Sequence, residues 1–184
     1  MTTGTAPVLL ADIGGTNARF ALGRPDGTIS GETALPVADF AGPVEAARAY
    51  LAETGTTPPP HAGAFAVACP VSGDAVRLTN HPWAFSVAAV RDALGFRTLR
   101  VVNDFAAQAA ALPRLGPDDR RVIGGGAAVS GQPMAVLGPG TGLGVASLVP
   151  CGDSWEPLAG EGGHVTLAAR DHREAAVIAR LAEG

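Results

Sequence analysis

The sequence contains no lysine, because all 13 of its basic residues are arginines. A P-loop needs Gly-Lys-Ser/Thr and a protein kinase needs a lysine on a strand, so both kinds of phosphate site are excluded. The dinucleotide fingerprint Gly-x-Gly-x-x-Gly is also absent, since the spaced glycines at 138–142 lead to Leu143 or Val145 where the third glycine belongs. Any nucleotide must therefore be held by other means.

Positive charge, cysteine and long apolar runs are scarce as well. The net charge of −4 leaves no basic stripe, which argues against nucleic acid as the main partner. No apolar run approaches the ~18 residues of a membrane helix, and the first residues carry no basic leader segment. Cys69 and Cys151 match no metal or redox spacing, so we interpret them as buried thiols in a reducing compartment. These absences predict a cytoplasmic protein without a membrane partner.

The order of apolar patterns predicts an α/β protein. We expect strands over 8–12, 18–22, 28–35, 64–71 and 98–105, helices over 41–54, 86–95, 106–115 and 171–183, and a strand–turn–strand unit over 134–150. The turn-rich stretch 116–131 is the candidate boundary, which divides the chain into domains over 1–114 and 115–184.

The stretch "VLLADIGGTNARFAL" joins two apolar runs through a glycine turn near the N-terminus. Gly14 and Gly15 leave backbone N–H groups unobstructed, so such a turn can wrap an anion, and Thr16 and Asn17 add side-chain donors. Asp12 would repel a bare phosphate, which indicates a divalent cation between them, bound partly through water. An ordinary hairpin explains this stretch equally well when it is considered alone.

The stretch "GPGTGLG" repeats this arrangement, with Gly140, Thr141 and Gly142 in a turn between two apolar strands. Two such turns facing each other across a cleft could hold one polyphosphate through backbone amides, hydroxyls and a metal ion.

An acid and an amide follow a buried strand in "VVNDFAAQ". Ligands collect at the carboxyl ends of strands in α/β sheets, so Asp104 could accept the proton of a substrate hydroxyl during phosphoryl transfer. Asn103 has one acceptor and two donors with which to orient neighbouring hydroxyls. The alternative is that Asp104 only caps the helix that follows.

Glu161 and His164 in "AGEGGHV" could bind a diol, since a carboxylate accepts two hydroxyl hydrogens and an imidazole donates or accepts one. The intervening glycines would let the two side chains converge; a histidine satisfied in the core is the alternative. In "LTNHPWAFS", a core role for Trp83 is more plausible than contact with a sugar.

Taken together, these segments resemble the bacterial glucokinases of the actin-like sugar kinase superfamily, in the family's order over essentially the whole chain. "ADIGGTNARFAL" and "LGPGTGLGVA" are similar to the two phosphate motifs, "LTNHPWAFS" to an interior signature, "VVNDFAAQAAALP" to the catalytic segment and "GEGGHV" to the sugar loop.

The resemblance implies an actin-like (ribonuclease H-like) fold and ATP- and Mg²⁺-dependent phosphorylation of glucose at its 6-hydroxyl. The resemblance implies that Asp104 is the catalytic base and that the sugar is bound by Asn103, Asp104, Glu161 and His164. It assigns the first phosphate and metal side to Asp12, Gly14, Gly15, Thr16 and Asn17, and the second phosphate site to Gly140, Thr141 and Gly142. The full-length form is expected to be a homodimer.

Family members are much longer than this chain, so we expect a small domain followed by only the first part of the large domain. The second part should then expose apolar side chains. Two alternatives remain open: a non-catalytic fragment that binds sugar or phosphate, and a kinase for another hexose.

Overall fold

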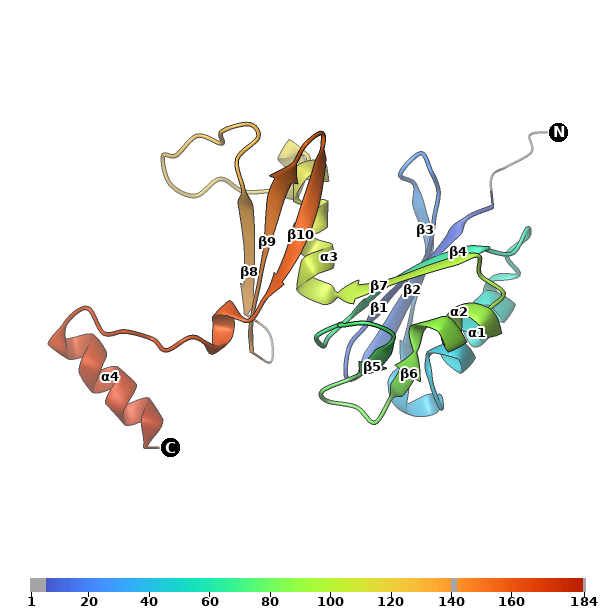
Figure 1. Cartoon of the computed structure of the whole chain (residues 1–184), viewed down its shortest axis with the longest axis horizontal. Helices are drawn as coiled ribbons and strands as arrows, with labels where there is room; N and C mark the ends of the chain where they lie inside the picture. The colour runs from blue at the N-terminus through green and yellow to red at the C-terminus, as the bar shows by residue number, and fades with distance from the viewer. Residues whose placement is uncertain (1–5, 140–141, 184) are drawn as a thin grey trace.

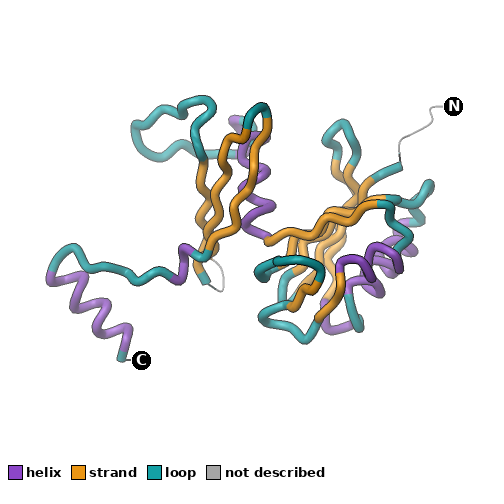
Figure 2. The backbone as a smooth tube through the Cα atoms, in the orientation of Figure 1, coloured by secondary structure: helices purple, strands orange, loops and turns teal. Residues whose placement is uncertain are grey.

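The computed structural model describes residues 6–139 and 142–183, and it contains two main sheets joined through one helix (Figure 1). The strand β7 of the first sheet leads directly into the helix α3, which lies between the two sheets (Figures 1 and 2).

The first sheet has five strands in the order β3-β2-β1-β4-β7. The strands β1, β2 and β3 form an antiparallel meander, whereas β4 and β7 run parallel to β1. This is the ribonuclease H-like arrangement that the resemblance implies. The strands are β1 (Val8–Ile13), β2 (Asn17–Gly23), β3 (Ile29–Pro36), β4 (Ala62–Val67) and β7 (Thr98–Asn103).

One face of this sheet forms the main core with the helices α1 (Pro43–Thr54) and α2 (Val87–Ala93), which lie on the same side of it (Figure 1). The ring of Phe20 stacks on Tyr50 with centroids 5.4 Å apart and meets Phe65 edge-on at 6.5 Å. The Tyr50 hydroxyl donates to the Gly31 carbonyl at 2.8 Å. Because side chains alternate along β1, Leu9 and Ile13 enter this core while Asp12 points to the opposite, open face.

The predicted helix at 86–95 is confirmed, since Ser86 caps α2 by accepting from the Ala89 N–H at 3.1 Å. In the stretch before it, the short strand β5 (Ala75–Arg77) pairs with β6 (Ala84–Ser86). The strand predicted over 64–71 begins and ends earlier, as β4.

The second sheet is an antiparallel meander in the order β10-β9-β8, and α3 packs against all three strands. Its small core centres on Ala109, Ala146 and Leu148. Although α3 also contacts β4 and β7, its buried residue Ala109 belongs to this second core. The division at residue 114 stays a prediction. The elements are α3 (Asp104–Ala111), β8 (Met134–Pro139), β9 (Leu143–Cys151) and β10 (Ser154–Gly160).

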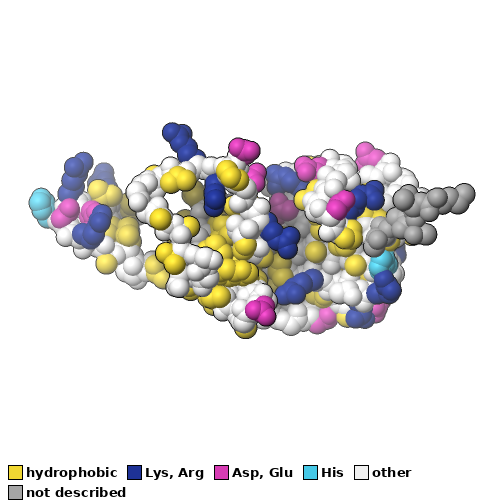
Figure 3. All heavy atoms as spheres, turned by 90° about the horizontal axis from the view of Figure 1, so that it is seen from above, with side chains coloured by type: hydrophobic (Ala, Val, Ile, Leu, Met, Phe, Trp, Pro, Cys, Tyr) yellow, Lys and Arg dark blue, Asp and Glu magenta, His cyan; other side chains and the backbone are white. Residues whose placement is uncertain are grey.

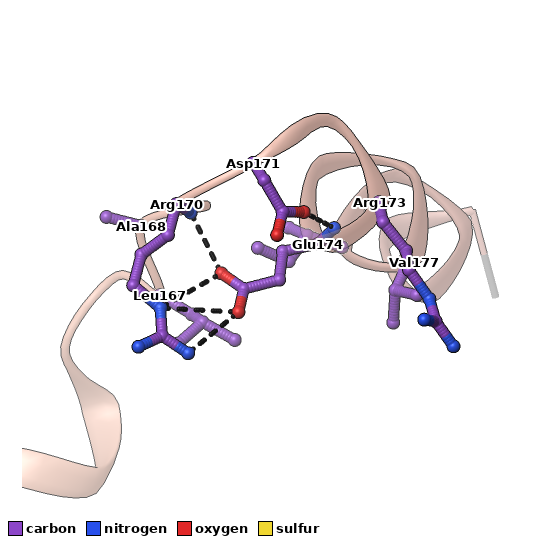
Figure 4. Close-up of a pocket in the computed structure, with 8 residues that line it drawn as sticks. Leu167, Ala168, Arg170, Asp171, Arg173, Glu174 and Val177 are labelled. Carbon is purple, nitrogen blue, oxygen red and sulfur yellow. Dashed lines mark hydrogen bonds and ion pairs between the residues drawn. The ribbon is translucent and has the colours of Figure 1, made fainter.

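The remaining elements are short, apart from the helix α4 (His172–Ala182). They are the 3₁₀ turns η1 (Val37–Asp39), η2 (Leu112–Arg114), η3 (Pro117–Asp119) and η4 (Gly162–His164). Asp171 caps α4 by accepting from the Glu174 N–H at 2.8 Å, and Glu174 in turn pairs with Arg170 at 2.9 Å. These contacts border a hollow of about 700 Å³ beside α4, which contains none of the predicted site residues (Figure 4).

Large apolar side chains are exposed mainly in the second part of the chain, as expected. Apart from Ile29, every strongly exposed one in the described residues lies at or beyond Leu115. Figure 3 shows such side chains on the surface between α4 and the first sheet. The prediction that both cysteines are buried is right for Cys69 and wrong for Cys151, which is exposed at the end of β9. In the described part of the chain, no helix is both long enough and apolar enough to cross a membrane.

Candidate active site

A cavity of about 380 Å³ brings together segments that are far apart in the sequence. It is lined by the first glycine turn, the segment after β4, the junction of β7 and α3, the start of β9 and the loop after β10. The predicted site residues that line it are Gly14, Gly15, Asn103, Asp104, Gly142, Glu161 and His164. Thr16 and Asn17 belong to the same turn but do not line it, and Gly140 and Thr141 lie outside the described residues.

Asp104 occupies the first turn of α3, but it does not cap the helix. Asn103 is the cap, since its Oδ1 accepts from the Ala106 N–H at 3.1 Å. Asp104 Oδ1 accepts from the Asn103 side-chain amide and from the Phe105 N–H, both at 2.9 Å. The capping alternative is therefore wrong for Asp104, whose carboxylate is fixed by its neighbours at the cavity wall.

Asn103 makes a further contact that sequence reasoning missed. Its Nδ2 donates to the Cys69 carbonyl at 3.3 Å as well as to Asp104. Both amide hydrogens are thus used within the protein, so only the Oδ1 retains capacity toward a ligand. Asn103 consequently orients Asp104 in addition to lining the cavity.

The electrostatics of Asp104 suit a proton acceptor. Partial burial raises its pKa above the ordinary value, and the nearby negative charge of Asp12 raises it further. The hydrogen bonds from Phe105 and Asn103 oppose this rise in the pKa. A carboxyl whose pKa is moved upward in a cleft is a recognised mark of a functional acid or base.

Cys69 forms part of the same wall without being reactive. Its thiol is buried, and burial together with the charge of Asp104 raises its pKa, so the protonated form is favoured.

The first glycine turn is closed by a hydrogen bond from the Gly14 N–H to the Asn17 carbonyl at 2.9 Å. The Gly14 amide is therefore not free for an anion, in contrast to our expectation. Within the described residues, the amides of Gly15 and Thr16 at the tip donate no hydrogen bond, and they remain available.

Space, rather than unusual backbone conformation, explains the glycine at position 15. Gly15 does not adopt a positive φ, and a Cβ there would come within 3.1 Å of the Asn80 Cβ. Asn80 and its neighbour Thr79 line the cavity, which sequence reasoning missed because the approach joins two distant segments. The "TNH" stretch that contains both was the available signal.

Asp12 lies beside the cavity rather than in its wall. Its Oδ2 pairs with Arg19 Nη1 at 3.2 Å across the strands β1 and β2, and both side chains are more than half exposed. The two residues border a separate hollow on the open face of the first sheet. Asp12 is nevertheless close enough to Asp104 for its charge to affect the pKa of that carboxyl.

The loop after β10 holds Glu161 and His164 together, with His164 Nδ1 at 3.0 Å from Glu161 Oε2. Both side chains are largely exposed and line the cavity, so the alternative of a core histidine is wrong. The glycines between them serve close packing instead of flexibility. A Cβ on Gly163 would overlap the Leu143 carbonyl oxygen, and one on Gly162 would come within 3.0 Å of Val145.

Trp83 belongs to the core, as the sequence favoured. It is 3% exposed, and its indole N–H donates to the Phe40 carbonyl at 3.0 Å. His81 meets its ring edge-on at 5.5 Å.

The described residues contain no cluster of three or more His, Cys, Asp or Glu side chains able to hold a metal ion by themselves. Mg²⁺ does not require one, because it commonly binds through one or two carboxylates together with waters and substrate phosphates. Asp12, an exposed carboxylate at the end of β1 just before the glycine turn, fits that kind of ligand set.

Comparison with known proteins places the chain among sugar kinases. The glucokinase family matches residues 9–184. A glucokinase from Paramagnetospirillum magneticum is 52% identical over 175 residues, which cover 95% of this chain and 54% of that protein. The chain thus spans about half the length of this relative.

Solved structures agree with the fold. The crystal structure of a glucokinase from an Antarctic psychrotroph has a TM-score of 0.85 and 40% identity, and the match covers 97% of this chain and 57% of the other. A ROK family glucokinase from Streptomyces griseus, in complex with glucose and AMPPNP, has a TM-score of 0.63 at 20% identity over 89% of this chain and 51% of the other. The actin-like fold class is therefore confirmed, and the chain belongs to the glucokinase family.

Proposed function

We propose that the protein, at the full length of its relatives, transfers the γ-phosphoryl group of ATP to the 6-hydroxyl of glucose. The observation that carries this proposal is the cavity that joins Asp104 to Glu161, His164 and the first glycine turn. Its volume of about 380 Å³ lies at the small end of ligand pockets, roughly 300–1,000 Å³, which suits a monosaccharide.

Asp104 acts as the general base. Its carboxylate accepts the proton of the sugar hydroxyl while the hydroxyl oxygen forms a bond to the γ-phosphorus and the bond to the bridging oxygen of ADP breaks. The Phe105 N–H and the Asn103 amide hold one carboxylate oxygen. The other oxygen is left to meet the hydroxyl.

Glu161 and His164, which line the same cavity, bind the sugar. The Glu161 carboxylate accepts hydrogen bonds from two hydroxyls, and the His164 imidazole, oriented by its contact with Glu161, completes the set. The free lone pair of Asn103 Oδ1 is a further acceptor. Because these groups recognise hydroxyl positions, a related hexose is the alternative substrate.

The tip amides of Gly15 and Thr16 receive phosphate oxygens, with Asn17 beside them. The turn containing Gly140, Thr141 and Gly142 forms the other side of the phosphate site. Asp12 would hold Mg²⁺, partly through water, and the ion would neutralise charge on the phosphates. In the structure the Asp12 carboxylate pairs with Arg19.

The protein works in the cytoplasm as a homodimer. The two free cysteines support the first statement, and the second rests on the resemblance to the glucokinases. Sedimentation equilibrium of the full-length protein at twice the monomer mass is the expected result.

The decisive test measures ATP-dependent formation of glucose 6-phosphate with wild type, Asp104→Asn and the control Asp153→Asn in the full-length protein. Asp153 lies in the exposed turn between β9 and β10. We expect Asp104→Asn to lower kcat about 10²- to 10⁴-fold with the control unchanged. Equal activity of all three proteins would refute the assignment of the base, and an inactive wild type would refute the proposed reaction.

A sugar- or phosphate-binding module without turnover is the second candidate, since the groups that line the cavity can bind hydroxyls whether or not phosphoryl transfer follows. Calorimetric titration of glucose and ATP into the 184-residue chain distinguishes the two. Sugar binding without product formation supports the module, whereas turnover excludes it. Comparing glucose with mannose, fructose and N-acetylated sugars identifies the preferred hexose.

A further inference from the structure

The ring of Phe105 lies on two glycines that face each other across the strands β8 and β9. Gly138 and Gly144 are partners in the antiparallel register of these strands. A Cβ on Gly138 would be 2.9 Å from the ring, and one on Gly144 would overlap it. Two neighbouring positions without side chains thus make a shallow depression that the phenyl ring fills.

Backbone conformation does not account for these two glycines. Neither has a positive φ, so other residues could adopt their dihedral angles. What excludes a side chain at both positions is the ring itself, because aromatic carbons cannot retreat as the end of a flexible side chain can. The glycines and the ring therefore depend on one another.

Phe105 also follows Asp104 directly in the chain. Its N–H donates to Asp104 Oδ1 at 2.9 Å, and Phe105 itself lines the cavity. A rotation of the first turn of α3 that moved the carboxylate would have to lift the ring out of its depression. The ring thus limits the positions that the carboxylate can take.

The two glycines stand on either side of the turn that joins β8 to β9, which is the predicted second phosphate turn. The geometry points to Phe105 as a positioning residue that ties the proton acceptor Asp104 to the strand pair at Gly138 and Gly144, so that the carboxylate keeps one position relative to these strands during phosphoryl transfer. This inference rests on the proposed kinase reaction. It explains why an apolar ring is required beside a polar site.

The test uses Phe105→Ala in the full-length protein, with kcat expressed per folded active site as counted by glucose binding. A displacement of about 1 Å at the reacting centre can cost about 10²-fold in rate. We expect kcat at saturating substrates to fall 10- to 100-fold, whereas the KM for glucose changes less than about threefold. A purely structural role would lower the melting temperature and the yield of folded protein but leave kcat per site unchanged, and that result would overturn the inference.

A second series tests the contact between the ring and the glycines. In the wild-type background, Gly144→Ala should lower kcat strongly, because the new methyl displaces the ring. In the Phe105→Ala background the same change should have little effect, since the space is then empty. The control Gly126→Ala adds the same methyl where nothing lies within 4 Å. Equal losses from Gly144→Ala in both backgrounds would contradict the inference, whereas an inactive wild type would contradict the proposed function instead.

Discussion

The substitution Gly163→Ala tests the placement of the sugar loop most directly. A methyl group on this residue would overlap the Leu143 carbonyl oxygen and lie only 2.8 Å from the carbonyl carbon. The obstacle is backbone within β9, which cannot rotate away, so the loop must move outward by on the order of 1 Å. Glu161 and His164 move with it.

The expected magnitude follows from the hydrogen bonds that this movement weakens. We expect the movement to break one hydrogen bond of Glu161 and one of His164, each worth about 0.5–1.5 kcal/mol, at a total cost of about 1–3 kcal/mol. This corresponds to a loss of about 5- to 150-fold in affinity for glucose. Stability should change less than affinity, because the loop is largely exposed.

The assay is calorimetric titration of glucose, with two glycine variants for comparison. Gly162→Ala meets the Val145 side chain at 3.0 Å without overlapping any backbone atom, so its effect should be intermediate. Gly126→Ala should have none, because that glycine is surrounded by open space. Glucose affinity of Gly163→Ala within twofold of wild type would refute the reasoning that the loop is fixed by close packing.

Three further predictions concern the base Asp104, the residue Asn103 that orients it, and the core residue Trp83. Burial and the charge of Asp12 raise the pKa of Asp104, and a general base must be ionised to accept a proton. In a pH profile, kcat/KM should therefore fall as the pH drops through a midpoint above about 3.9, the ordinary pKa of an aspartate. A midpoint at or below that value would contradict this prediction. Asn103→Ala should lower kcat by more than about tenfold and the free energy of unfolding by about 1 kcal/mol. Asn103→Ser can cap α3 but cannot reach Asp104, so in urea titrations it should restore the stability without restoring kcat. Recovery of kcat as well would disprove the role of Asn103 in holding the Asp104 carboxylate. Trp83→Phe leaves the Phe40 carbonyl without its hydrogen-bond donor, so the free energy of unfolding in urea should fall by about 1–3 kcal/mol while kcat stays unchanged. A loss of activity without a loss of stability would indicate that Trp83 contributes to the active site instead.

The sequence predicted the elements of the fold well where local signals were strong. Ser86 before an apolar helical pattern located α2, and the alternation of apolar runs located the first two strands. The pairing of β5 with β6 was not predicted, because it joins two short segments across a loop and has no local signature. The place of α3 between the two cores was missed for a similar reason: a single amphipathic pattern does not say which sheet it will cover.

The residue types of the site were predictable, but their local partners were not. The stretches "NDF" and "GEGGH" identified Asp104 and Glu161 as candidates that now share one cavity. Which of the two residues at the start of α3 caps the helix depended on side-chain orientation, and the sequence did not decide between them. The close approaches of Gly15 to Asn80 and of Gly163 to Leu143 were also not predicted, because an approach between distant segments leaves no trace in the local sequence.

The double use of the Asn103 side chain links heat tolerance to reactivity. The same amide secures the start of α3 and restrains the carboxylate, so thermal fraying of that first turn would release Asp104 before the sheets separate. Turnover would then reach its maximum at a temperature below the midpoint of global melting. Adaptation to warmer conditions would have to strengthen the helix start without changing residue 103.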